Sequence, residues 1–219
     1  MNKAKPIATP QLPNQLTTIS NPIQAIKSDE SLYEILIIDA DLSSQSVKAL
    51  DISDSKLEKI VASEANLERL AFRDVVLLHS DFTATNCAEA SWQRVLLENM
   101  RCSGLKLQTS TLKDVTFRDC KLDLANFRFS KLKNVCFIDC ILNEADFYAS
   151  KLDNVQFQSC SLDKTEFSSA KLKQVDLRTS EISNISGISS LTGATIDSTQ
   201  LIAIAPILAN EAQIKVIDD

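Results

Sequence analysis

Apolar residues recur at every fifth position over most of the chain. From Leu32 to Ile182, 31 consecutive positions at this spacing are apolar. An α-helix repeats its buried face every 3.6 residues and a strand every two, so neither element keeps a side chain inward at a spacing of five. A fixed short period over such a length is typical of a solenoid. The pattern therefore predicts a repeat protein whose unit is five residues.

A second period, of twenty residues, sets the cross-section of this solenoid. The apolar residue at each fifth position is the central residue of its unit. The residue two positions before it is small and recurs every twenty residues, which forms a column along the solenoid, as at Cys120, Cys140 and Cys160. Four units therefore complete one turn, and each unit forms one side of a square coil. Successive coils would stack through strand-like hydrogen bonds at a spacing of about 4.8 Å. We expect residues 31–196 to form this all-β solenoid.

The central residues of the C-terminal half alternate between phenylalanine and leucine from Phe117 to Leu172. In a four-sided coil this alternation places phenylalanine opposite phenylalanine across the axis. The core should therefore contain many aromatic rings. Phe129 is the only phenylalanine away from a central position, and it lies within reach of Tyr148 on the next coil.

Several units share a short motif with a known family. Ala125-Asn126-Phe127, Ala145-Asp146-Phe147 and Ala65-Asn66-Leu67 resemble the A-(D/N)-(L/F)-x-x motif of the pentapeptide-repeat family. The resemblance covers about 150 of the 219 residues and implies a right-handed quadrilateral β-helix. The chain departs from the motif where lysine precedes the central residue, and that position is expected to face solvent.

The same resemblance suggests two kinds of function. Some pentapeptide-repeat proteins are DNA mimics that occupy the DNA site of gyrase and protect it from quinolones. That mimicry needs dense negative charge, whereas residues 32–182 contain 23 acidic and 19 basic residues. We therefore expect a non-enzymatic protein–protein interaction module or scaffold of unknown partner, with gyrase protection as the alternative.

The composition provides few candidate catalytic residues. The chain is 44% apolar and 24% charged, with a formal net charge of −6. It has no apolar run of about 18 residues and no apolar signal region, so a cytoplasmic protein without a membrane partner is expected. The only histidine is His79, and an uninterrupted rod offers no concave site. We expect no enzyme activity and no cofactor.

The six cysteines allow more than one interpretation. Cys120, Cys140 and Cys160 form an inward column whose spacing is compatible with a disulfide, although packed parallel side chains rarely have the required geometry. We interpret them as small buried apolar residues. Cys136 alone is expected to face solvent. No histidine or carboxylate converges on the column, so no metal site is expected.

Two surfaces are candidates for partner binding. A basic strip on the side centred on Leu132 could steer an anionic partner. It lacks interleaved arginine and aromatic residues, so direct nucleic-acid binding is not expected. Outward apolar residues that stack on adjacent coils, Val76, Leu78 and Leu96, form the second surface. The basic strip consists of Lys113, Lys131, Lys133, Lys151, Lys171 and Lys173.

The two ends of the chain differ from the repeat. Residues 1–30 contain four prolines among polar residues and predict a flexible N-terminal tail that could settle on the first coil near Ile23–Ile26. Residues 197–219 predict a cap for the open coil edge, with a helix from Thr199 to Ala205, a further turn from Pro206 to Ala212 and a final strand over 214–217.

The cap is also a candidate dimerisation module. Its apolar residues cover more than one helix face, and in relatives that this chain resembles a similar module joins two rods end to end. A homodimer is therefore expected. The interface residues would be Leu201, Ile202, Ile204, Ile207 and Leu208.

Overall fold

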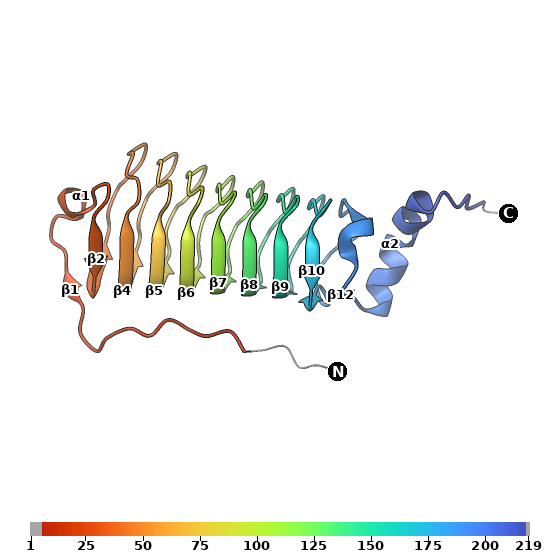
Figure 1. The fold of residues 1–219 in the computed structure, drawn as a ribbon, viewed down its shortest axis with the longest axis horizontal. Coiled ribbons are helices and arrows are strands. Elements are labelled where there is room, and N and C mark those ends of the chain that lie inside the picture. Colours follow the sequence, from red (N-terminus) through yellow and green to blue (C-terminus); the bar gives the residue numbers. More distant parts are fainter. Residues whose placement is uncertain (1–5, 218–219) are drawn as a thin grey trace.

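The structure is a computed structural model that describes residues 6–217, and it shows one parallel sheet wound into an elongated solenoid (Figure 1). The strands are β1 (Thr17–Thr18), β2 (Ser31–Tyr33), β3 (Ile35–Ile38), β4 (Asp51–Glu58), β5 (Ala71–Leu78), β6 (Ser91–Glu98), β7 (Thr111–Arg118), β8 (Lys131–Ile138), β9 (Lys151–Gln158), β10 (Lys171–Lys173), β11 (Val175–Asp176) and β12 (Ala194–Thr195). The helices are α1 (Pro22–Ala25), the 3-10 helix η1 (Ile188–Leu191) and α2 (Ser198–Glu211).

Each long strand pairs in parallel with the strand that follows twenty residues later. Ile52 of β4 lies opposite Phe72 of β5, for example. A long strand covers two sides of the coil, and isolated bridges such as Asp81 to Arg101 connect the remaining sides. The predicted square coil is confirmed, and the solenoid has about nine turns.

The corners of the coil use an unusual backbone conformation. Every fifth residue from Asp29 to Thr179 has a positive φ, and only Gly104 among them is glycine. This conformation is unfavourable for residues with a side chain and persists only where the surroundings hold it. Hydrogen bonds between coils do so, as where the Phe129 N–H donates to the Tyr148 carbonyl at 3.0 Å.

The core confirms the predicted aromatic arrangement. Phe147 stacks between Phe127 and Phe167, with centroid distances of 4.7 and 5.3 Å and nearly parallel rings. It also meets Phe137 and Phe157 edge-on across the axis, at 6.2 and 5.9 Å. Stacked and edge-on contacts are the favourable geometries for aromatic rings.

All six cysteines are buried free thiols. The prediction that Cys136 faces solvent is wrong, since the residue is only 4% exposed. Its side chain is short and lies in register between Thr116 of β7 and Gln156 of β9, so its neighbours shield it. Burial raises the pKa of the Cys136 thiol to about 12.

Within residues 1–30, predicted as a flexible tail, the described residues from 6 onward contain β1 and α1. β1 pairs with β3, and Ile26, within the stretch expected to reach the first coil, is 4% exposed. The preceding segment runs back along the solenoid (Figure 1). The Gln11 N–H donates to the carboxylate of Asp74 on β5 at 3.0 Å. Residues 1–5 lie outside the described residues.

Asp74 provides a pH-dependent contribution to stability. The Arg94 side chain hydrogen-bonds the carboxylate, with 2.6 Å from Nε to Oδ1, and lowers the pKa of Asp74. A lowered pKa in the folded state means that the contribution is present above about pH 4 and is lost as the pH falls below that value. We expect Asp74→Asn to lower the free energy of unfolding by about 1.5–3 kcal/mol at pH 7 and by less at pH 3.

Urea unfolding of both proteins at the two pH values measures this effect. The substitution suits the backbone, because Asn134 and Asn154 occupy the same corner column with φ of 53° and 55°. Titration of other carboxylates cancels in the difference between the two proteins. A difference that stays constant with pH would contradict the assignment.

At the C-terminal end, α2 is one helix of 14 residues rather than two shorter segments. Pro206 lies inside it, and the carbonyl that the proline leaves without a helical partner belongs to the exposed Ile202. The predicted strand over 214–217 is absent from the described residues. β12 pairs with β11, and α2 separates residues 214–217 from this edge, so they meet no strand partner (Figure 1).

Candidate functional site

A column of three lysines crosses the side of the solenoid formed by the first halves of β8, β9 and β10. Lys131 lies opposite Lys151, and Lys151 lies opposite Lys171, so the three occupy successive coils about 4.8 Å apart. All three are exposed. We call Lys131, Lys151 and Lys171 the lysine ladder.

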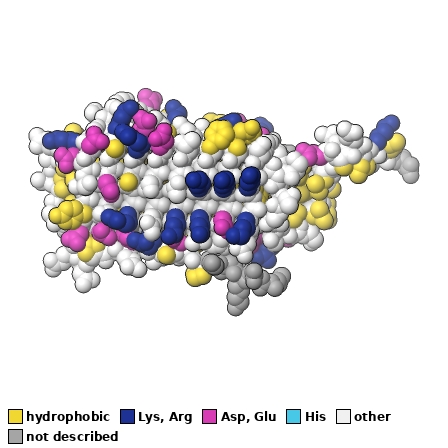
Figure 2. All heavy atoms as spheres, in the orientation of Figure 1, with side chains coloured by type: hydrophobic (Ala, Val, Ile, Leu, Met, Phe, Trp, Pro, Cys, Tyr) yellow, Lys and Arg dark blue, Asp and Glu magenta, His cyan; other side chains and the backbone are white. Residues whose placement is uncertain are grey.

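The remaining lysines of the basic strip form a second column on the same side. Lys113, Lys133, Asp153 and Lys173 lie in register on β7 to β10. Asp153 accepts a hydrogen bond from Lys173 at 3.2 Å. Figure 2 shows the two rows of basic side chains, with one acidic group within the lower row. The structure therefore brings all six lysines of the predicted strip together.

The lysine ladder has no opposite charge next to it in its column, where the uncharged Thr111 of β7 precedes Lys131. Elsewhere, ion pairs join residues twenty positions apart, as in Lys48 with Glu68 at 2.8 Å and Arg118 with Glu98 at 3.4 Å. Among the residues that the structure describes, none of the three ladder lysines has a carboxylate within 4.0 Å. Like charges on directly opposed strand positions destabilise a sheet.

The acidic residues on the other sides are partly compensated. Glu144 lies 3.9 Å from Lys164, and Asp163 accepts a hydrogen bond from Asn184 at 2.7 Å. Asp146 pairs with Arg128 at 2.8 Å. Neighbouring groups therefore moderate the negative charge on these sides, in contrast to the positive charge of the lysine ladder.

An aromatic cluster lies at the corner next to the lysine ladder. The Phe129 ring meets the Tyr148 ring edge-on at 5.7 Å, as their positions predict. The Arg128 guanidinium lies 4.3 Å from the centre of the Tyr148 ring and 5.5 Å from that of Phe129. Sequence reasoning missed Arg128, although its position twenty residues before Tyr148 places both on one column. We call Arg128, Phe129 and Tyr148 the aromatic corner.

The predicted apolar surface of Val76, Leu78 and Leu96 is less exposed to solvent than the lysine ladder. Val76 and Leu96 lie in register on β5 and β6, as expected. Leu78 lies in register with Glu58 and Glu98 on the two adjacent strands. All three apolar residues are half-buried.

The five apolar residues proposed for a dimer interface fall on two sides of α2. Ile204 is 2% exposed and joins the core, and Ile207 packs against that core. Leu201, Ile202 and Leu208 face solvent and are exposed by 50, 75 and 38%. The residues available to a partner are therefore these last three.

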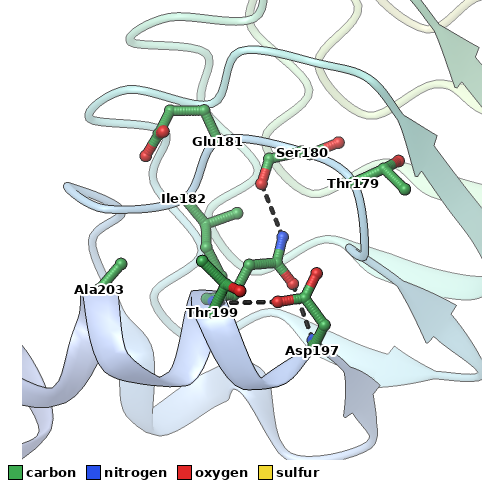
Figure 3. Close-up of a pocket in the computed structure, with 8 residues that line it drawn as sticks. Thr179, Ser180, Glu181, Ile182, Asp197, Thr199 and Ala203 are labelled. Atoms are coloured by element: carbon green, nitrogen blue, oxygen red, sulfur yellow. Dashed lines mark hydrogen bonds between the residues drawn. The ribbon is translucent and has the colours of Figure 1, made fainter.

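The junction of α2 with the last coil contains a depression of about 340 Å³. Figure 3 shows Asp197 and Thr199 at the start of α2, opposite Ser180 and Glu181 of the coil. The hydrogen bonds of Asp197 and Gln200 at this junction stabilise the start of α2 and attach it to the last coil. The Gln200 amide donates to the Leu177 and Ser180 carbonyls at 2.7 and 2.6 Å, and Asp197 accepts from the Gln200 N–H at 2.9 Å as an N-cap.

Two further observations concern the described residues 6–217. No group of three or more His, Cys, Asp or Glu side chains among them is placed to hold a metal ion. No helix in this part of the chain has both the length and the apolar character that a membrane crossing requires.

Comparisons with known proteins agree with the coil geometry. Residues 110–186 match the family model described as a pentapeptide repeat region. The comparison with curated proteins gave no match.

Solved structures with weak similarity include two described by their function. One is trypsin-treated QnrB1, a plasmid-mediated fluoroquinolone resistance protein, with 17% identity, a TM-score of 0.40, and coverage of 93% of this chain and 100% of that one. Another is HetL from Nostoc sp. strain PCC 7120, a pentapeptide repeat protein involved in heterocyst differentiation regulation, with 16% identity, a TM-score of 0.33, and coverage of 83% and 98%. Residues 110–186 are therefore a pentapeptide repeat region, and the same five-residue coil continues on both sides of them.

Proposed function

We propose that this protein is a non-enzymatic interaction module that binds an anionic macromolecule through its basic strip, with the lysine ladder at the centre. One observation carries the proposal: Lys131, Lys151 and Lys171 are exposed, in register and without an opposite charge within 4.0 Å in the described structure. The solenoid is the rigid support that fixes their spacing.

A bound anion would remove an existing electrostatic cost. Two unit charges 5 Å apart repel by about 1 kcal/mol in water, and flexible lysine side chains reduce this by moving apart. A partner with several negative groups would replace that repulsion with attraction at each coil. The ladder would also steer the partner during association, in spite of the net charge of −6, because screening confines the field to about 8–10 Å.

We further propose that two copies join through α2, so that each assembly presents two basic strips. The outward face of α2 is apolar at Leu201, Ile202, Ala205 and Leu208, and no charged residue occurs between Ser198 and Asn210. The same uncharged face of a second copy would pack against it and remove both apolar surfaces from water. The six free thiols support a cytoplasmic location, where protein disulfides are rare.

Gyrase protection remains the alternative. QnrB1, one of the weakly similar solved structures, is a plasmid-mediated fluoroquinolone resistance protein. DNA mimicry requires a continuous acidic face, whereas the basic strip interrupts negative charge along one side of this solenoid. The charge distribution therefore favours an anionic partner over gyrase.

Binding to a heparin column tests the proposed function. We expect the triple variant Lys131→Glu, Lys151→Glu, Lys171→Glu to elute at clearly lower salt than the wild-type protein. The substitutions reverse the charge of the three side chains that would bind the sulfate groups of heparin. The matched control is Lys106→Glu, Lys121→Glu, Lys164→Glu, which changes the net charge equally at exposed lysines on other sides.

The control variant should elute closer to the wild-type protein than to the ladder variant. Equal elution of the two triple variants would mean that net charge alone governs binding, and it would overturn the assignment of the ladder as the site. Circular dichroism would verify that both variants keep the solenoid fold.

A further inference from the structure

The aromatic corner and the lysine ladder form one continuous surface. Phe129 is the corner residue that leads into β8, and Lys131 is the first residue of that strand. Tyr148 belongs to the next coil, three residues before Lys151. Figure 2 shows hydrophobic side chains directly beside the upper row of basic ones. An extended ligand that follows the ladder would therefore pass the aromatic rings.

The position of the aromatic corner bears on the expectation that the protein does not bind nucleic acid directly. That expectation was based on the absence of arginine and aromatic residues from the basic strip. The fold supplies both from the adjoining side, because Arg128 and Tyr148 belong to the side that precedes the strip along the coil. Phe129 is 53% exposed, so its ring is accessible to a ligand beside the three lysines.

The chemistry of the surface favours one class of anion. An acidic peptide would use the lysines, but its carboxylates gain nothing from an exposed phenylalanine. A single-stranded nucleic acid uses both, since phosphates contact lysines and unpaired bases stack on aromatic rings. In a duplex the bases are already stacked, so the ring would have no open base face to contact.

We propose that the lysine ladder and the aromatic corner bind single-stranded nucleic acid, with phosphates along Lys131, Lys151 and Lys171 and a base stacked on Phe129. This inference rests on the proposed function and gives the anionic partner a chemical class. Phe129 can only stack, because its ring has no hydrogen-bonding group, so little preference among base sequences is expected.

Fluorescence anisotropy with a labelled twelve-residue oligothymidylate tests the proposal, with a twelve-residue glutamate peptide as the second probe. We expect Phe129→Ala to weaken oligothymidylate binding by about ten-fold or more and to leave peptide binding unchanged. Ala149 occupies the same corner column with φ of 54°, so alanine suits this backbone.

The salt dependence separates the two parts of the surface. Replacing the three ladder lysines by alanine should lower the slope of log K against log salt by about 2, since each phosphate contact contributes about 0.7. Phe129→Ala should leave that slope unchanged. Lys164→Ala, on another side of the coil, is the control and should change neither affinity nor slope. An unlabelled duplex of equal length should compete less well than the single strand.

The outcomes distinguish this inference from the proposed function. Binding of the glutamate peptide without binding of the oligothymidylate would overturn the nucleic-acid proposal and leave the interaction module standing. Binding of neither probe would overturn both. Oligothymidylate binding that is insensitive to Phe129→Ala would remove the aromatic corner from the site and contradict the inference.

Discussion

Replacing Phe147 by alanine should lower the free energy of unfolding by about 3–5 kcal/mol, the range for deleting a buried phenylalanine. Phe147 is fully buried and contacts four other phenylalanine rings at centroid distances from 4.7 to 6.2 Å. The cavity would lie within a column of stacked rings between two hydrogen-bonded coils. Those coils cannot close the gap without breaking their register.

Urea unfolding followed by circular dichroism would measure this loss. The matched control is Phe129→Ala, the same deletion at the exposed corner, which should cost less than about 1 kcal/mol. Phe147→Leu provides a milder variant in case the alanine protein does not fold, and it should cost about 1–2 kcal/mol. Similar losses for Phe147→Ala and Phe129→Ala would contradict the role assigned to the stacked core.

The second large expected effect concerns assembly. Ile202→Asp should convert a dimer into a monomer and so halve the mass measured by light scattering. Ile202 is 75% exposed on the apolar outward face of α2, so the carboxylate would face water in a monomer and would be buried without a partner in a dimer. Burial of an unpaired charge is strongly unfavourable.

Two controls make this test specific. Thr199→Asp places the same charge on α2 but outside the apolar face, and it should leave the dimer intact. Ile204 is unsuitable for the test, because it is 2% exposed within the core and a charge there would disturb the cap itself. A wild-type protein with the mass of one chain would contradict the dimer proposal directly.

The candidate site could be predicted only in part. The six lysines were identified because the twenty-residue period places them on one side, and the structure confirms their registers. Arg128 was missed because its importance depends on a ring contact between coils, which the period indicates only by position. The exposure of Cys136 was mispredicted because its shielding depends on the neighbouring side chains of β7 and β9.

The end of the solenoid shows why local sequence is a weaker guide outside the repeat. Gly187 interrupts the five-residue pattern, and a Cβ there would lie only 2.2 Å from the backbone nitrogen of Ser168. Beyond it, the residues over 214–217 have high strand propensity and yet form no strand. A strand needs a neighbour to hydrogen-bond, and α2 lies between this segment and the sheet edge.

The sequence by itself determined the unit of five, the square coil and the aromatic core, because each coil repeats the same contacts and the period therefore specifies which side chains turn inward. Only the tertiary structure decided which side of α2 stays exposed and how closely Arg128, Phe129 and Tyr148 gather beside the lysine ladder. Those features depend on contacts between side chains on different coils or elements, where the geometry of each neighbour sets the distance and the exposure.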